Sequence, residues 1–401
     1  LGSLSARLLL GLAAGAAPGP AAPRELVVVG EPRAAAGVAP VARAPVPQAD
    51  NTLYSHGDPT PQEQLMLELV NRARANPAAE AARLGLDLNE GLPPDTISPD
   101  PKPPLAFHPL LIAAARAHSD WMLAHDIFSH EGVDGSSPGD RMSAAGYGFS
   151  GSWAWGENIA WQGTTGTANL NQFTVAEHEA LFRSPGHREN LLNADFDEVG
   201  IGVRSGVFSV ANETTGLTTH YNAVMTTQNF ARSDNTPGPL VLGVVYRDAD
   251  GDGFYTPGEG LAGLTVQPTS GHYYAVTSAS GGFAFPAPAT AGSLTVIFSG
   301  PDLVVPVSRT VTLSTVNVKV DLNLAQDVPL TFVPGSFGVT ASRQFRFDLN
   351  GPVGARARVE YSSDLVTWQT LGTYTLNAGK VPVTDPQGLQ ARRSYRAVLV
   401  P

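Results

Sequence analysis

The chain has 401 residues, of which 42% are hydrophobic and 15% charged, so it can build the cores of about two to four domains. Its formal charge of −11, with no basic cluster, argues against a nucleic-acid partner. Because there is no cysteine, a disulfide framework, thiol catalysis and cysteine-ligated zinc are excluded.

The first predicted element is a secretory signal peptide over residues 1–20. Arg7 precedes an apolar run over residues 8–17, and small residues and proline follow. This run is shorter than the ~20 residues of a membrane-spanning helix, and we expect no transmembrane segment elsewhere. The signal peptide predicts a secreted or surface-associated protein; an Ala-rich leader without an export role is the alternative. Residues 21–58 are rich in Ala, Pro and Val without periodicity, which predicts a disordered linker.

A domain with helices first and strands later is predicted over residues 59–232. Its first helix has Thr60 as N-cap, Pro61 at the first position and Glu63 closing a capping box. Further helices are predicted from Pro109, from residues 137–140 and from Thr174. Strand-like runs follow at 199–203 and 222–230. Without βαβ alternation, this order predicts an α+β domain.

Two β modules are predicted after residue 232. Residues 233–238 have the composition of a linker. Short Val/Thr/Tyr runs punctuated by Gly and Pro then predict a β-sandwich over residues 238–325. A second β module is predicted over 329–401, where residues 359–368 resemble repeats at the ends of large secreted bacterial proteins. The predicted fold class is therefore multidomain, α+β followed by two all-β, sandwich-like modules.

Six short motifs in residues 59–232 resemble those of the CAP superfamily, also called the SCP domain, in its cysteine-free bacterial form. In chain order they are NRAR at 71–74, ARAHS at 115–119, FSH at 128–130, GENIA at 156–160, SPGHR at 184–188 and GIGV at 200–203. The resemblance implies an α-β-α sandwich with a cleft that holds two histidines and two acidic residues. In that pattern His130 and His187 match the cleft histidines, and Glu157 matches the first acid.

The second acid of the family's cleft has no counterpart here. It normally lies one helical turn after a Trp on the helix that precedes the last histidine. Leu181 stands at the Trp position, and Ser184 follows three residues later. Glu177 and Glu179 lie on the same helix but do not match the position.

The trio His130, Glu157 and His187 has the chemistry of an open zinc site, since two neutral imidazoles with a carboxylate or water suit Zn²⁺. The cleft then recognises a ligand, which can be a small molecule, lipid, glycan or protein. Alternatively, metal-bound water or Glu157 as base attacks a peptide or ester bond, making the protein a hydrolase. The missing second acid favours binding over catalysis. A structural module of the cell surface, with the trio locking turns together, is the third alternative.

Structural roles are predicted for several other residues of this domain. Asn71 and Arg74 are expected to tie loops to the first helix, and His118 to be a half-buried histidine with satisfied hydrogen bonds. Trp153, Trp155 and Trp161 flank the Gly-Glu-Asn turn. They are predicted to line a groove for an apolar or glycan ligand; packing in the core is the alternative.

A calcium loop is predicted within residues 248–259. Aspartates stand at positions one, three and five, Gly at six and Glu at twelve, which is the spacing of an EF-hand loop. Strands rather than helices flank it, as in B-type repeats of bacterial surface proteins, which it resembles. We expect Ca²⁺ to stiffen the module; a solvated acidic turn is the alternative. The expected ligands are Asp248, Asp250, Asp252, the Phe254 carbonyl, Thr256 and Glu259.

Overall fold

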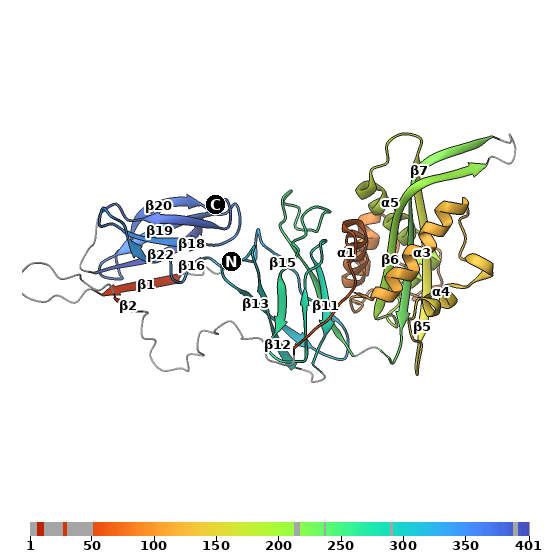
Figure 1. The fold of residues 1–401 in the computed structure, drawn as a ribbon, viewed down its shortest axis with the longest axis horizontal. Helices are drawn as coiled ribbons and strands as arrows, with labels where there is room; N and C mark the ends of the chain where they lie inside the picture. Colours follow the sequence, from red (N-terminus) through yellow and green to blue (C-terminus); the bar gives the residue numbers. More distant parts are fainter. Residues whose placement is uncertain are drawn as a thin grey trace, which may run out of the picture. The chain divides into compact units, whose positions relative to one another are not determined.

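The computed structural model describes residues 6–11, 27–29, 51–211, 217–235, 238–288, 292–387 and 392–400. The chain divides into two compact units, residues 48–300 with 308–322, and residues 1–47 with 301–307 and 323–401. The expected order of an α+β region followed by all-β sheets is confirmed (Figure 1). Most of the predicted signal peptide and linker lies outside the described residues. Among the described helices, none has the length and apolar character needed to cross a membrane.

A four-stranded sheet in the order β4-β6-β7-β5 organises the α+β region. Its two longest strands form an antiparallel hairpin in which Gly200 pairs with Asn229. β5 lies at one edge and was not predicted as a strand. The strands are β4 (Ala106–Phe107), β5 (Ala154–Thr164), β6 (Glu198–Ala211) and β7 (Thr218–Arg232).

In the described part of the chain, six α-helices surround this sheet. Thr60 makes the capping box expected at the start of α1, and Ser137 makes a capping box at the predicted start of α4. α5 begins earlier than predicted, with Asn169 as its N-cap, while the Thr174 hydroxyl donates to the Leu170 carbonyl at 2.8 Å. The helices are α1 (Pro61–Ala75), α2 (Pro77–Leu84), α3 (Pro109–His125), α4 (Pro138–Ala144), α5 (Leu170–Arg183), α6 (Pro185–Leu192) and the 3₁₀ helix η1 (Val133–Gly135).

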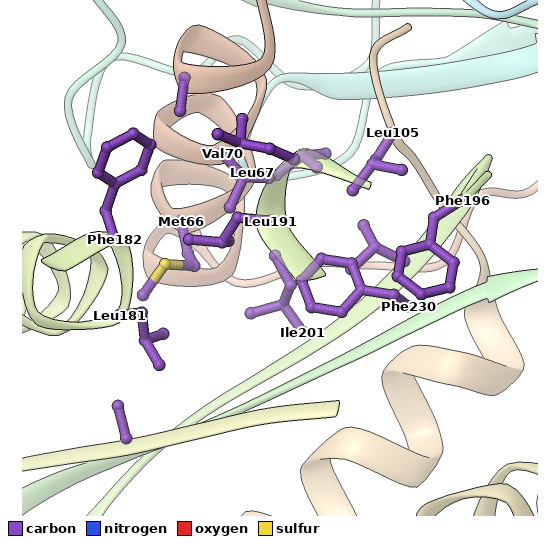
Figure 2. Close-up of a cluster of buried hydrophobic side chains, with 14 of the residues drawn as sticks. Met66, Leu67, Val70, Leu105, Leu181, Phe182, Leu191, Phe196, Ile201 and Phe230 are labelled. Atoms are coloured by element: carbon purple, nitrogen blue, oxygen red, sulfur yellow. The ribbon is translucent and has the colours of Figure 1, made fainter. Parts of the chain in front are cut away.

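Helices cover both faces of the sheet. On one face, α1, α5 and α6 enclose a cluster that includes Met66, Phe182, Leu191 and Ile201 (Figure 2). On the other face, α3 packs so closely on β6 that a Cβ at Gly200 would lie 1.9 Å from the Leu111 carbonyl carbon. These opposite helical layers leave the outer edge of β5 as the place where both faces can be reached.

The strand region of the same unit consists of two sheets. One has the order β13-β12-β9-β10-β3, and the other β11-β8-β14 with β15 paired to β8. Residues 52–53, within the predicted linker, supply β3. The strands are β3 (Thr52–Leu53), β8 (Leu240–Tyr246), β9 (Thr265–Pro268), β10 (Tyr273–Val276), β11 (Gly282–Pro286), β12 (Gly292–Ser299), β13 (Val307–Leu313), β14 (Val318–Lys319) and β15 (Leu322–Asn323).

This strand region packs directly on α1. Leu65 and Leu69 of α1 form a buried cluster with three residues of the strand region, Val244, Tyr246 and Tyr255. The Lys319 ammonium lies 2.8 Å from the buried Glu68 carboxylate. In addition, the Asn317 amide donates to the carbonyls of Pro104 and Asp197, at 3.0 and 2.7 Å. The two regions therefore share an interface with apolar, ionic and hydrogen-bonded contacts.

The second unit is all β. Its sheets have the orders β2-β1-β22-β19-β20 and β16-β18-β17, with β21 paired to β18. Its core holds Phe345, Phe347 and Tyr395. Residues 6–11 of the predicted signal peptide pair with β22 as β1. The strands are β1 (Ala6–Gly11), β2 (Val27–Val29), β16 (Thr331–Phe332), β17 (Gly338–Val339), β18 (Phe345–Asn350), β19 (Arg356–Ser362), β20 (Gln369–Thr375), β21 (Lys380–Thr384) and β22 (Arg392–Val400).

Candidate functional site

The predicted cleft residues gather around the edge strand β5. Glu157 and Asn158 are neighbours on this strand, so their side chains point to opposite faces of the sheet. Glu157 meets residues from the α3 and α4 side, and Asn158 meets α6. The site thus wraps around one strand edge.

Glu157 is the most strongly held member of the site. Its side chain is 1% exposed, and both carboxylate oxygens have partners. Arg141 donates to Oε2 at 2.6 Å, and the His130 Nδ1 lies 2.9 Å from Oε1. With its amide oriented to satisfy both neighbours, Asn229 also donates to Oε2, at 3.1 Å. A buried carboxylate requires such partners, so Glu157 is built into the site as a fixed acceptor.

Arg141 is a site residue that the sequence analysis missed. Besides pairing with Glu157, its guanidinium donates to the carbonyls of His130 and Ser136, at 2.9 and 2.7 Å. It therefore fastens the 130–136 segment to the edge strand. The sequence signal was the capping box at Ser137, which starts α4 one turn before Arg141, but no motif marks the arginine itself.

His187 enters the site from α6. Its Nδ1 lies 2.7 Å from the Ser184 hydroxyl, and its backbone carbonyl accepts from Asn158 at 3.2 Å. Asn190, also on α6, donates to the Glu157 carbonyl at 3.3 Å and to the Asn158 side chain at 3.0 Å. These bonds tie the start of α6 to the edge of β5.

The two histidines lie close enough to influence each other. Burial lowers the pKa of His187, and the nearby positive charge of His130 lowers it further. His130 is about half exposed, at 51% of its side chain. The structure therefore places His130, from the loop after α3, against Glu157 of β5, and it places His187 of α6 against the neighbouring Asn158 on the same strand.

The hydrogen bonds of both rings suit a metal ligand. Each Nδ1 has an oxygen partner, Glu157 or Ser184, and neither Nε2 has a hydrogen bond to the described part of the chain. Zinc-binding histidines usually donate one ring N–H to an oxygen and offer the other nitrogen to the metal. The residues thus fit zinc held by two Nε2 atoms, with Glu157 orienting His130. Among the described residues, the trio does not bring three ligand atoms within 4.8 Å of one another.

Neither alternative acid on α5 reaches this site. Glu177 is buried and accepts a hydrogen bond from the Thr226 hydroxyl of β7, and burial raises its pKa well above the usual range. Glu179 pairs with Arg83 at 2.8 Å. The site therefore contains one carboxylate from the family's cleft pattern.

The residues expected to be structural make many backbone contacts. The Asn71 side chain exchanges two hydrogen bonds with the Leu105 backbone, at 2.8 and 3.0 Å. Arg74 donates to the carbonyls of Pro103, Leu191 and Asn193, and burial lowers its pKa to about 10. His118 was expected to be half-buried with satisfied hydrogen bonds, but it is fully buried. It stacks on Trp121 and its Nε2 lies 2.9 Å from the Ser129 carbonyl, while its Nδ1 has no hydrogen-bond partner among the described residues.

An apolar groove of about 310 Å³ adjoins the site between α3 and α4. Arg141 belongs to both the groove and the Glu157 network. A ligand with an apolar part can therefore lie beside the histidines while touching the same arginine. The groove's other lining residues include Ala113, Ala117, Trp121, Val133 and Ala144.

The three tryptophans do not line one groove. Trp153 is 53% exposed and lies 5.3 Å from Phe149, between ring centres. Trp161 instead packs on Phe208 and Tyr221 of the β6–β7 hairpin. It stands six positions after Trp155 on β5, which is roughly 20 Å along a strand.

The predicted calcium loop closes on itself between β8 and β9. Carboxylate oxygens of Asp248, Asp250 and Asp252 all lie within 4.8 Å of one another. The Glu259 carboxylate accepts from the backbone of Ala249 at 2.7 Å and of Thr256 at 2.9 Å. Gly251 and Gly253 have φ values of 79° and 77°, which glycine adopts easily. Phe254 donates its N–H to Asp252, at 2.7 Å.

Comparison with known proteins supports the resemblance over part of the chain. Residues 67–210 match the model of the CAP family, described as the cysteine-rich secretory protein family. A curated relative, the uncharacterized protein YkwD of Bacillus subtilis (strain 168), is 35% identical over 105 residues. That match covers 26% of this chain and 36% of the relative, so the chain spans about a third of the relative's length. Residues 67–210 therefore carry a CAP domain.

Two solved structures are also similar. An extracellular SCP-domain protein from Bacillus anthracis str. Ames is 30% identical, with 33% of this chain and 35% of that chain covered and a TM-score of 0.24. An outer surface protein from Borrelia burgdorferi is 16% identical, with 43% of this chain and 93% of that chain covered and a TM-score of 0.26.

Proposed function

We propose that this is an exported or surface-associated protein whose CAP domain binds a ligand at a two-histidine zinc site. The observation that carries the proposal is the pairing of both Nδ1 atoms with oxygens, which leaves both Nε2 atoms for a metal. Bound zinc would supply an open coordination position for a ligand group. The description of the matched family as secretory supports the location outside the cell.

Recognition fits the site better than hydrolysis. A general base must lie within reach of the proton that it removes, so it has to be accessible to the substrate or to a bound water. In Glu157 both oxygens already have partners, and the side chain is 1% exposed. We expect no zinc-dependent turnover of a broad peptide and ester library. Turnover that is lost on changing Glu157→Gln would instead establish the hydrolase.

The neighbouring groove indicates the kind of ligand. Half of its lining residues are alanines, and Trp121 and Val133 add further apolar surface. The groove therefore favours the apolar part of a lipid or of a protein side chain over a glycan. Ligand binding there would place a polar group near the histidines through the shared Arg141.

The test of the zinc site is calorimetric titration of the full chain. We expect one zinc site in the wild type, weakened in each single variant and lost in the His130→Ala, His187→Ala double variant. His125→Ala is a matched control, since His125 is exposed and its ring bonds the Trp121 carbonyl. Unchanged binding in the double variant would remove the proposal.

We further propose that the loop at residues 248–259 binds calcium. The twelve-residue spacing and the convergence of three aspartate carboxylates support a site for a hard cation. Its role would be structural, since Phe254 and Tyr255 of the loop contact α1: the Arg72 guanidinium lies 5.0 Å from the Phe254 ring centre. Calcium would then stiffen both the loop and its contact with the CAP domain.

The calcium site is tested by thermal unfolding of the full chain. Calcium at a hundredfold excess over its Kd should add about 2.7 kcal/mol of stability. Asp250→Ala should abolish this gain, whereas Asp195→Ala, at an exposed position outside the loop, should keep it. If calcium does not change the melting temperature of the wild type, the loop is an ordinary turn.

A further inference from the structure

Ser184 begins α6 in an unusual way. At the starts of the other five described α-helices, the N-cap side chain accepts a hydrogen bond from a backbone N–H of the first turn. Ser184 is the N-cap of α6, and its side chain makes no such bond. Serine is among the best capping residues, so its hydroxyl has been diverted from its usual partner.

The diverted hydroxyl lies 2.7 Å from the Nδ1 of His187. Backbone contacts keep the pair in place, since the His187 carbonyl accepts from Asn158 and the Ser184 carbonyl accepts from the Arg188 N–H at 2.9 Å. A neutral ring has one proton, and its hydrogen bond decides which nitrogen holds that proton.

Two arrangements satisfy this distance. If Ser184 accepts from Nδ1–H, the Nε2 of His187 has a free lone pair. If Ser184 donates to Nδ1, Nε2 carries the proton, and no described residue holds that N–H in a fixed direction. The second arrangement is the one that a serine nucleophile would require, and it lacks the third group that orients such a base.

We propose that Ser184 is the positioning residue of His187, holding its proton on Nδ1 and thereby aiming a free Nε2 into the site. Ser184 then does for His187 what Glu157 does for His130, with a neutral hydroxyl in place of a carboxylate. This inference adds to the proposed zinc site, and the zinc-affinity measurement that tests it depends on that site. It also explains how a site with one acid can orient two histidines.

Nitrogen-15 NMR of the histidine rings in the metal-free full chain tests the proton position. Spectra are recorded at a pH where both rings are neutral. In the wild type we expect the His187 proton on Nδ1. Ser184→Ala removes the acceptor, so the proton should move to Nε2, whereas Ser184→Thr keeps a hydroxyl and should restore the wild-type signal.

Zinc affinity and melting temperature give the second and third readouts. Loss of an orienting group typically weakens metal binding by about 10–100-fold, so we expect that loss for Ser184→Ala and recovery for Ser184→Thr. The melting temperature should stay unchanged in Ser184→Ala, because no cap is lost. Ser137→Ala is the matched control: it removes a real cap and should lower the melting temperature while leaving the His187 proton and zinc affinity as they were.

The outcomes separate this inference from the zinc proposal. A His187 proton on Nε2 in the wild type, or one unaffected by Ser184→Ala, overturns the role of Ser184. A proton that follows Ser184 in a protein that binds no zinc supports the positioning role and contradicts the metal site alone.

Discussion

At the scale of single residues, the site depends on which ring nitrogen of each histidine, and which oxygen of Glu157, takes part in each hydrogen bond. His130, Glu157 and His187 could be predicted because each stands within a short motif. Arg141 could not, since its role comes from a 2.6 Å contact across 16 residues of sequence. The diverted hydroxyl of Ser184 was equally invisible, because a serine before Pro185 has the appearance of an ordinary N-cap.

His108 links helix capping to pH. As N-cap of α3, its Nδ1 accepts from the Leu110 N–H at 3.2 Å, so this nitrogen must be unprotonated. Burial lowers its pKa from 6.5 to about 4. The unfolded chain therefore binds this proton before the folded protein does, and stability is lost as pH falls from 6.5 towards 4.

His108→Asn should flatten this part of the pH profile, because asparagine is a good N-cap that does not titrate in this range. The measurement is the free energy of unfolding by denaturant at several pH values between 4 and 7. His125→Asn, at an exposed position, serves as control and should keep the wild-type slope. An unchanged slope in His108→Asn would show that other groups cause the acid sensitivity.

At the scale of elements, two capped helices were predictable, whereas α6, β5 and α2 were not. Thr60 and Ser137 marked α1 and α4 correctly. α6 was not predicted, although Pro185 suits the first position of a helix. β5 was missed because Gly156, Glu157 and Asn158 favour turns over strands. α2 lies in a segment that was not assigned. The missed α6 and β5 carry His187 and Glu157.

The contact between α3 and β6 gives a prediction at this scale. Gly200→Ala would place a methyl group 1.9 Å from backbone of α3, which a rotamer change cannot relieve. We expect a loss of about 3 kcal/mol or more in the free energy of unfolding. Gly206→Ala is the matched change on the same strand, since its Cβ would meet the flexible Leu123 side chain at 3.3 Å, and should cost less than about 1 kcal/mol. Equal effects would contradict the close packing of these two backbones.

At the scale of the whole molecule, α1 shows why a correct helix can still be assigned the wrong surroundings. Helical periodicity alone would assign its apolar residues to one stripe that faces a single core. In the structure they divide: Met66 and Val70 join the cluster on the sheet, while Leu65 and Leu69 join the strand region. Helical periodicity reports which residues are apolar but not how many partners they meet. The domain boundaries at 232 and 238 stay predictions, and the shared interface was not foreseen.

Because α1 packs both on the sheet and on the strand region, the CAP domain depends on the strands that follow it. A polypeptide cut after Arg232 would keep every motif of the cleft, yet it would bare Leu65, Leu69 and Ala106, which the strands now shelter. The Glu68 carboxylate would also lose its ion pair with Lys319. The excised domain would expose this apolar surface to solvent and would tend to aggregate. We therefore expect the two regions to fold as parts of one polypeptide.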